Sequence, residues 1–224
     1  MKIDFSNKIT IVVGGSRGIG LKVKEKFSSL GSEVYSISRT EGVDISIPEQ
    51  VDKYLMQFKK IDFLINVVGI NYTKKIEEIE LSEWEEVIKT NLTSIFYVTK
   101  QCISKMDQGS RIVNVSSIAG RNRSLVSGVH YTSSKSGLIG FTRQLAFELG
   151  PKDINVNCVS PGFISTDMTK KIEENYKEIL KSRIPLDRFG DPKDIANTVL
   201  FLCSNLSDYI TGETIHVNGG MYFS

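Results

Sequence analysis

Short apolar segments alternate along the chain with longer segments in which apolar residues recur every three or four positions. The short segments are rich in Val and Ile and almost continuously apolar, which is typical of strands buried on both faces of a parallel sheet. The longer segments have the period of helices that cover such a sheet. The expected strands are Lys8–Val13, Glu33–Ser38, Asp62–Val67, Arg111–Ser116, Asn155–Val159 and Thr214–Val217. The expected helices are the segment from a glycine-rich turn to Leu30, then Pro48–Lys59, Ser82–Met106 with a break near Lys89, Tyr131–Leu149, Ile172–Lys181 and Pro192–Leu202.

This alternation predicts the α/β class, with a Rossmann-like, doubly wound parallel sheet and helices on both of its faces. The chain contains no internal repeat, low-complexity stretch or linker. We therefore expect a single domain that covers residues 1–224.

Composition and charge exclude several classes of protein. The chain has 224 residues, of which 40% are hydrophobic and 24% are charged, as in an ordinary globular protein rather than a disordered or fibrous one. The net charge of +2 and the scattered lysines give no basic patch for a nucleic acid. No apolar run approaches the roughly 18 residues of a membrane span, and the first residues do not form a signal peptide. We expect a cytoplasmic protein that binds neither membranes nor nucleic acids.

The cysteines and histidines give no sign of a disulfide framework or a metal site. Cys102, Cys158 and Cys203 are odd in number and lie far apart, so we expect buried, reduced thiols. With only His130 and His216, no spacing typical of zinc ligands exists, and we expect no metal.

A glycine-rich turn joins the first strand to the first helix. Gly14 allows a tight turn, Gly18 lets the backbone approach a pyrophosphate, and Gly20 allows the helix to pack closely on the strand. The free N–H groups at the start of the helix, after Ser16, attract a phosphate. The spacing G-x-x-x-G-x-G differs from the general dinucleotide fingerprint, and a turn with no ligand is the alternative.

The end of the second strand indicates which dinucleotide would bind. NAD-binding proteins place an acidic residue there for the ribose hydroxyls, but here the chain reads Ser36-Ile37-Ser38-Arg39-Thr40. Arg39, together with Arg17 of the glycine-rich turn, suits a 2′-phosphate. We therefore predict NADP(H), with two solvated surface arginines as the alternative.

Asp44 follows the second strand in the sequence Val43-Asp44-Ile45. This segment could form a third strand, and Asp44 at its end could bind the adenine amino group. An acidic residue in a surface turn is an equally good interpretation.

Tyr131 and Lys135 form a Y-x-x-x-K motif on an expected helix. Residues four apart share a helix face, and an ammonium beside a phenol lowers the pKa of that phenol from about 10 toward neutrality. Tyr131 could then donate a proton to a carbonyl during its reduction. The motif occurs often by chance, so alone it is weak evidence.

Two further polar residues complete a candidate site. Ser117 ends the strand Arg111–Ser116 at the carboxyl edge of the sheet, where ligands bind, and could hydrogen-bond a substrate carbonyl. Asn91 lies inside a long helical segment and can mark a kink whose freed carbonyl holds a water molecule. The alternatives are a helix cap or turn for Ser117 and an ordinary N-cap for Asn91.

Together these residues resemble the short-chain dehydrogenase/reductase family over essentially the whole chain. The resemblance rests on the order and spacing of Gly14, Gly18-Ile19-Gly20, Asp44, Asn66-Val67-Val68-Gly69, Asn91, Ser117, Tyr131, Lys135 and Pro161-Gly162. Two stretches, 157–169 and 209–221, are similar to those of bacterial 3-oxoacyl-[acyl-carrier-protein] reductases.

The resemblance implies a role for each of these residues. Ser117 orients the substrate carbonyl, Tyr131 donates the proton, Lys135 binds the nicotinamide ribose and lowers the pKa of Tyr131, and Asn91 holds a water in a proton relay. Ile164 and Thr166 lie against the nicotinamide. The full set of expected cofactor-binding residues is Gly14, Ser16, Arg17, Gly18, Ile19, Gly20, Arg39, Asp44, Ile45, Asn66, Gly69, Tyr131, Lys135, Pro161, Gly162, Ile164 and Thr166.

The chain departs from the family pattern at several places. Val13 stands where the family has Thr, Val67-Val68 stands for Asn-Ala, and the stretch Thr40–Ile47 is short. Asp107-Gln108 replaces a basic site for an acidic carrier protein. Candidate basic contacts for such a carrier are Arg121, Arg123, Lys152, Lys170 and Lys171.

The expected function is NADPH-dependent reduction of a ketone to a secondary alcohol, with a 3-oxoacyl thioester as the substrate, either free or on an acyl carrier protein in fatty acid synthesis. The alternatives are the same chemistry on a small free ketone, alcohol or sugar, and a non-catalytic nucleotide-binding regulator. The family resemblance also implies a homotetramer. The apolar residues of two helices cannot all face one sheet, so a second apolar face is left for a partner subunit. These residues are Ile95, Phe96, Leu138, Phe141, Leu145 and Phe147.

Overall fold

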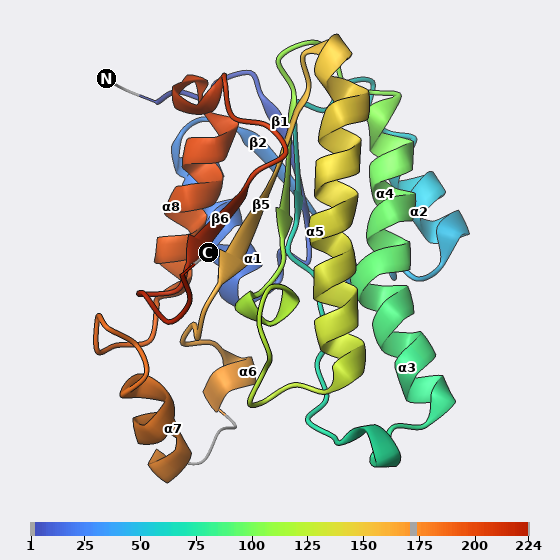
Figure 1. Cartoon of the computed structure of the whole chain (residues 1–224). Helices are drawn as coiled ribbons and strands as arrows, with labels where there is room; N and C mark the ends of the chain where they lie inside the picture. The colour runs from blue at the N-terminus through green and yellow to red at the C-terminus, as the bar shows by residue number, and fades with distance from the viewer. Residues whose placement is uncertain (1–2, 171–173, 224) are drawn as a thin grey trace.

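The computed structural model describes residues 3–170 and 174–223, and in these residues six parallel strands form one sheet (Figure 1). The order across the sheet is β2-β1-β3-β4-β5-β6. The strands are β1 (Ile9–Val13), β2 (Glu33–Ile37), β3 (Phe63–Asn66), β4 (Arg111–Val115), β5 (Asn155–Pro161) and β6 (Thr214–Val217). The chain leaves β1 toward β2 on one side and returns to β3 on the other. The order therefore reverses beside β1, where ligands bind in such sheets.

Helices cover both faces of the sheet, as the sequence predicts (Figure 1). On one face lie α1 (Gly18–Ser29) and α8 (Pro192–Cys203), and on the other lie α2 (Pro48–Leu55), α4 (Ser94–Ile103) and α5 (Val129–Leu149). The remaining helices are α3 (Leu81–Ile88), α6 (Asp167–Lys170) and α7 (Glu174–Lys181). Short 3-10 turns occur at Arg39–Glu41, Ile76–Glu78, Ile118–Gly120, Gly150–Lys152 and Asn205–Ser207. The α/β, doubly wound fold is thus confirmed.

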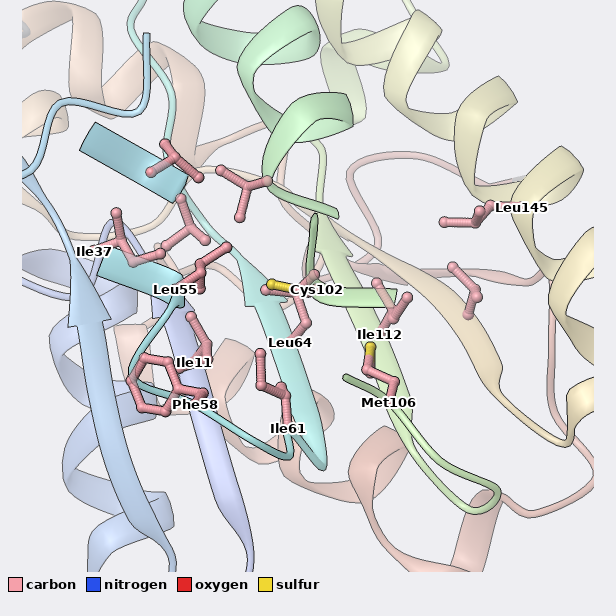
Figure 2. Close-up of a cluster of buried hydrophobic side chains, with 14 of the residues drawn as sticks. Ile11, Ile37, Leu55, Phe58, Ile61, Leu64, Cys102, Met106, Ile112 and Leu145 are labelled. Atoms are coloured by element: carbon pink, nitrogen blue, oxygen red, sulfur yellow. The ribbon is translucent and has the colours of Figure 1, made fainter. Parts of the chain in front are cut away.

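The alternation of side chains along each strand divides the core into two layers. Ile11, Leu64 and Ile112 point to the face covered by α2, α4 and α5, where they pack with residues such as Leu55 and Cys102 (Figure 2). Their neighbours in sequence point to the other face, against α1 and α8. Because both faces are buried, the strands are almost continuously apolar, and this is why the sequence located them correctly.

The expected third strand, Val43–Ile45, is not formed. Arg39–Glu41 makes a 3-10 turn, and Gly42 turns the chain with φ +84° before the segment reaches the sheet edge. The side chains of Val43 and Ile45 are nevertheless buried, and they pack into the core beneath α2. The connection is too short to run alongside β2, so β2 is the edge of the sheet.

Helix boundaries differ from the prediction in ways that matter for the site. The expected break near Lys89 is real, because a π-helical segment, Lys89–Thr93, separates α3 from α4. Helix α5 begins at Val129, two residues before the expected start. The start of the helix expected at Ile172 lies outside the described residues.

Ion pairs hold the amino ends of the strands in place. The cleft described below lies at the opposite, carboxyl ends of the strands. Asp62 accepts hydrogen bonds from the backbone of Ile9 and pairs with Lys8 and Lys60, each at 3.0 Å. Burial opposes ionisation of Asp62, but these hydrogen bonds prevail and the pKa of the carboxyl is lowered. Arg111, at the start of β4, pairs with Asp208 at 2.8 Å.

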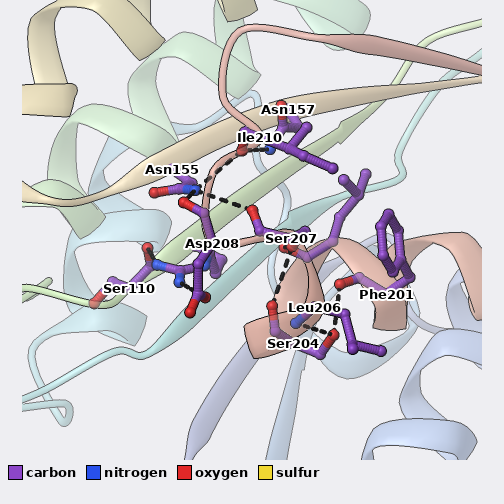
Figure 3. Close-up of polar contacts among 11 residues, drawn as sticks. Ser110, Asn155, Asn157, Phe201, Ser204, Leu206, Ser207, Asp208 and Ile210 are labelled. Atoms are coloured by element: carbon purple, nitrogen blue, oxygen red, sulfur yellow. Dashed lines mark hydrogen bonds and ion pairs between the residues drawn. The ribbon is translucent and has the colours of Figure 1, made fainter.

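Two asparagines of β5 hold the loop that connects α8 to β6 (Figure 3). The amide of Asn155 donates to the carbonyl oxygens of Asp208 and Ile210 at 2.9 and 3.0 Å, and that of Asn157 donates to Ile210 at 2.7 Å. Both asparagines are buried. They therefore fix the approach of the chain to the last strand of the sheet.

The three cysteines are free and buried, as expected. Burial raises the pKa of the Cys102 thiol to about 12 and that of Cys158 to about 11. Within residues 3–170 and 174–223, no helix is long and apolar enough to cross a bilayer. The same residues contain no cluster of three or more His, Cys, Asp or Glu side chains suited to a metal ion.

Candidate active site

The glycine-rich turn packs tightly between β1 and α1. Gly14 has φ +90°, and a side chain there would come within 2.9 Å of the backbone nitrogen of Val68. A Cβ on Gly20 would overlap the carbonyl oxygen of Gly14. Helix α1 has Arg17 as its N-cap, no side-chain cap and no acidic residue in its first turn. Its free N–H groups and the positive end of its dipole are therefore available to an anion.

A cleft of about 1590 Å³ runs along the carboxyl ends of the strands and past the glycine-rich turn. Most of the expected site residues line it. They are Gly14, Ser16, Arg17, Gly18, Ile19, Gly20, Arg39, Asp44, Ile45, Gly69, Ser117, Tyr131, Lys135, Pro161, Gly162, Ile164 and Thr166. The fold thus brings residues from six parts of the chain to one site, at the edge of the sheet where α/β proteins bind ligands.

Asn66 does not belong to this set, and its role as a cofactor-binding residue stays a prediction that its side chain does not support, because it does not line the cleft. The side chain is fully buried and donates to Asn114 at 2.8 Å and to Thr99 at 3.3 Å. It ties β3 to β4 and α4 inside the core. The residues of this motif that reach the cleft are Val67, Val68 and Gly69.

One end of the cleft, between the glycine-rich turn and the end of β2, carries two arginines. Arg17 and Arg39 are both exposed and line this end. Asp44 also lines it, but its carboxylate accepts the backbone N–H of Ser46 at 2.8 Å, as in a turn. Burial opposes ionisation of Asp44, but the hydrogen bonds from Ser46 and the nearby charge of Arg39 prevail and lower its pKa. The adenine contact of Asp44 stays a prediction.

The expected catalytic residues meet at the middle of the cleft. Tyr131 lies in the first turn of α5, and the Lys135 ammonium is 5.8 Å from the centre of its ring. The same ammonium donates to the backbone carbonyl of Val115 at 3.0 Å. Ser117 follows β4, and its hydroxyl accepts the N–H of Ala119 at 3.1 Å. The Y-x-x-x-K spacing and the strand end thus place both motifs on one cleft wall.

Burial determines the pKa values of this pair. It raises the pKa of Tyr131, against a smaller lowering by the hydrogen bond with Ser117. Burial also lowers the pKa of Lys135 to about 8. The Lys135 ammonium is turned toward the carbonyl of Val115. The lowering of the Tyr131 pKa by Lys135, which the family resemblance implies, stays a prediction.

Asn91 lies behind the cleft wall rather than on it. The side chain is fully buried in the π-helical segment, accepts the N–H of Ile70 at 2.8 Å and donates to the carbonyl of Ile70 at 2.9 Å. It also donates to Ser134 of α5 at 3.1 Å. A Cβ on Gly69 would lie 3.6 Å from the Asn91 amide oxygen and 3.2 Å from the Lys135 nitrogen. Asn91 is thus no N-cap, and it fixes the backbone next to Lys135.

The segment after β5 closes the cleft from the other side. Gly162 is needed because a side chain there would meet Asn218 at 2.9 Å. Ile164 is buried and forms a β-bridge with Gly190. The Thr166 methyl group lies 3.5 Å from where a Cβ on Gly18 would be, so this segment faces the glycine-rich turn.

Sequence reasoning missed Tyr176 and Arg183 at the open end of the cleft, whereas it named Arg123 as a candidate carrier contact. The three residues line this end together, although they come from a loop and from the region around α7. The Tyr176 hydroxyl reaches the carbonyl oxygen of Leu125 at 3.5 Å, across the cleft. No sequence motif predicts such residues, because they come close together only through the position of α7 beside the cleft.

One predicted carrier contact is not supported by the fold. Lys152 follows the carboxyl end of α5, about 21 residues beyond Tyr131, which corresponds to roughly 30 Å of helix. It therefore lies near the amino ends of the strands, away from the cleft at their carboxyl ends. Arg121 is exposed beside the cleft and Arg123 lines it. The side chain of Lys170 and the whole of Lys171 lie outside the described residues.

Sequence comparison connects this chain to a group of reductases. The model of a family described as Enoyl-(Acyl carrier protein) reductase matches residues 22–222. A 3-oxoacyl-[acyl-carrier-protein] reductase of Aquifex aeolicus (strain VF5) is 42% identical over 250 aligned positions, covering 99% of this chain and 100% of the relative. The protein of the same name from Escherichia coli (strain K12) is 34% identical over 245 positions, covering 98% of this chain and 99% of the relative.

Structural comparison agrees. A short-chain dehydrogenase/reductase of Brucella melitensis, titled glucose/ribitol dehydrogenase, matches with a TM-score of 0.92 and 32% identity over 100% of both chains. A blue fluorescent protein from a metagenomic library, solved in complex with NADPH, matches with a TM-score of 0.90 and 28% identity over 99% of this chain and 100% of the other. With the motif order, the six-stranded sheet and these full-length matches in place, the chain belongs to the short-chain dehydrogenase/reductase family of oxidoreductases.

Proposed function

We propose that this protein reduces the ketone of a 3-oxoacyl thioester to a secondary alcohol with NADPH. The observation that carries the proposal is that Ser117, Tyr131 and Lys135 open onto the same cleft as the glycine-rich turn. A hydride donor bound by the turn and a ketone held by these side chains would share one enclosure. The relatives with 42% and 34% identity are named for this substrate class.

The residues of the cleft fit a phosphorylated dinucleotide. Because Gly20 has no side chain, α1 packs directly against the backbone of Gly14 in the glycine-rich turn. The uncapped start of α1 offers N–H groups to a pyrophosphate. Arg17 and Arg39 stand at one end of the cleft with no acidic residue at the tip of β2, which suits a 2′-phosphate. When bound, NADPH supplies the hydride for the carbonyl carbon.

Each side chain then has a separate task. The Ser117 hydroxyl holds the substrate carbonyl oxygen, and the Tyr131 hydroxyl holds the proton that this oxygen receives. The raised pKa of Tyr131 keeps the proton on the phenol before reaction. Lys135, four residues along α5, would bind the nicotinamide ribose, and its charge favours the phenolate that the transfer leaves behind. Asn91 keeps the backbone beside Lys135 in place through Ile70.

Carrier docking and assembly belong to the same proposal. The exposed cations of Arg123 and Arg183 at the mouth of the cleft would meet an acidic carrier protein. Phe96 and Phe147 are 49% and 79% exposed on α4 and α5, a surface suited to subunit contact, and we propose a homotetramer. The buried, free thiols suit a reducing cytoplasm.

A paired assay tests the substrate. NADPH oxidation is followed with an acetoacetyl group on an acyl carrier protein and with the same group on a small thiol. We expect turnover of both, with a lower KM for the carrier-linked form that rises with salt. The charge reversals Arg123→Glu and Arg183→Glu should raise only the carrier-linked KM. An enzyme that turns over the small thioester but ignores the carrier would refute the carrier partner.

Tyr131→Phe tests the chemistry. The variant should lose about 10²–10⁴-fold in kcat and keep its affinity for NADPH, because only the proton donor is removed. Normal turnover by Tyr131→Phe would overturn the assignment.

A sugar or other small free ketone is the second candidate. It is favoured by the Brucella melitensis structure, which is named a glucose/ribitol dehydrogenase and shares 32% identity over the whole chain. Oxidation of ribitol or glucose with NADP at a higher kcat/KM than any acetoacetyl thioester would select this candidate.

A further inference from the structure

The helix that carries Tyr131 begins without an ordinary cap. Its N-cap residue is Gly128, which has no side chain to accept a hydrogen bond from the first turn. Tyr131 is the third residue of the helix, and its N–H is one of the donors that no helical carbonyl satisfies. In most helices a Ser, Thr, Asp or Asn side chain at the N-cap serves this donor.

His130 serves it here. Its Nδ1 lies 2.8 Å from the backbone nitrogen of Tyr131 and accepts the hydrogen bond. The ring is fully buried. A Cβ on Gly128 would come within 2.8 Å of Nδ1, so an ordinary capping residue could not stand at position 128 while the ring occupies its place. The glycine and the histidine together replace the usual cap.

The opposite side of the ring is held from α3. Because Nδ1 accepts, the ring proton is on Nε2, which lies 3.2 Å from the Glu83 carboxylate and donates to it. Glu83 in turn binds the ammonium of Lys74, and this hydrogen bond lowers the pKa of its carboxyl. The Tyr72 ring contacts the imidazole with centroids 6.1 Å apart. The tautomer and the orientation of the ring are therefore both fixed.

From this geometry we propose that His130, oriented by Glu83, is a positioning residue for the reaction, which sets the first turn of α5 and with it the location of the Tyr131 hydroxyl. His130 does not line the cleft, so it acts through the backbone of Tyr131 and not on the substrate. The inference rests on the proposed role of Tyr131 as proton donor. An error of about 1 Å in such a group can cost about 100-fold in rate.

Two substitutions of His130 test the hydrogen bonds of its two ring nitrogens separately. Asn can place an acceptor near the position of Nδ1, and Gln can place a donor near that of Nε2. His130→Asn should stay within about threefold of the wild-type kcat, whereas His130→Gln and His130→Ala should lose about tenfold or more. The KM for NADPH should stay within about twofold in all three, because the glycine-rich turn is untouched.

Tyr97→Phe is the matched control. The Tyr97 hydroxyl donates to Asp52 at 2.8 Å, so this change also removes a hydrogen bond between two elements, but at residues that do not line the cleft. It should lower the Tm and leave kcat unchanged. A fall in kcat as large as that of His130→Gln would show that general destabilisation explains the effect, and the proposal would fail.

A measurement without turnover separates this inference from the proposed function. Hydrogen exchange of the Tyr131 amide should be slow in the wild type and in His130→Asn, and faster in His130→Gln. If His130→Gln keeps wild-type protection and kcat, or if His130→Asn loses as much as His130→Gln, the positioning role is refuted. If Tyr131→Phe is fully active while the exchange pattern holds, the capping role stands and the proposed proton donor fails.

Discussion

Lys135 should make the stability of the protein depend on pH in the alkaline range. Lys135 is 3% exposed, and burial lowers the pKa of its ammonium to about 8 from the usual 10.5. Below pH 8 both the folded and the unfolded chain hold the proton, so the slope is small. Between pH 8 and 10.5 only the unfolded chain holds it, and the free energy of unfolding rises with pH. From pH 7 to pH 10 the contribution of Lys135 amounts to about 2–3 kcal/mol.

The assay is urea denaturation of the wild type and of Lys135→Met, without added nucleotide, at each pH unit from 7 to 10. The buried cysteines act in the opposite direction, because their thiols ionise only in the unfolded chain within this range. Subtracting the two curves cancels that contribution. The wild type should gain about 2–3 kcal/mol on the variant across the range. Parallel curves would refute the reasoning, since they would mean that Lys135 titrates alike in both states.

Three further predictions address cofactor, assembly and loop. Arg17→Ala with Arg39→Ala should weaken NADPH binding about 10–150-fold and NADH binding little, measured by nucleotide fluorescence, because loss of a bidentate charge-assisted contact with the 2′-phosphate costs about 1.5–3 kcal/mol; equal losses would exclude 2′-phosphate recognition. Phe96→Asp with Phe147→Asp should convert the proposed tetramer to smaller species in analytical ultracentrifugation, and a monomeric wild type at micromolar concentration would contradict that assembly. Asn155→Ala should cost about 1–3 kcal/mol of stability, since it removes the hydrogen bonds of a buried side chain to the carbonyl oxygens of Asp208 and Ile210, while kcat stays constant; an unchanged Tm would contradict this.

The sequence was sufficient for the sheet because burial on both faces leaves a strong local pattern. The same holds for the Y-x-x-x-K pair, since residues four apart on a helix face the same way wherever the helix lies. The segment Val43–Ile45 carries the composition of a strand, but a strand exists only if a neighbour can pair with it. Its short connection prevents that, and the local pattern contains no information on this constraint.

The site was predicted less completely than the fold, for a similar reason. The pKa of Tyr131 depends on how far packing removes water from the phenol, which no spacing records. Asn66 carries a family motif, yet its side chain turns into the core toward Asn114. Lys152 is a suitable charge at the wrong end of a helix. His130 was considered only when a zinc site was excluded, because its role depends on Glu83, 47 residues earlier in the chain.

The amino and carboxyl ends of the strands lie on opposite sides of the molecule, and this separation has a practical consequence for attaching the protein to a surface. The turn at 107–109 is exposed and adjoins the amino end of β4, whereas the cleft lies at the carboxyl ends of the strands. The three native thiols are buried, so a thiol introduced at Gln108 would be the accessible one. Coupling through Gln108→Cys would immobilise the molecule in a single orientation, with the cleft directed away from the support and open to substrate. Sensors and flow reactors need that orientation, and random coupling through surface lysines does not provide it.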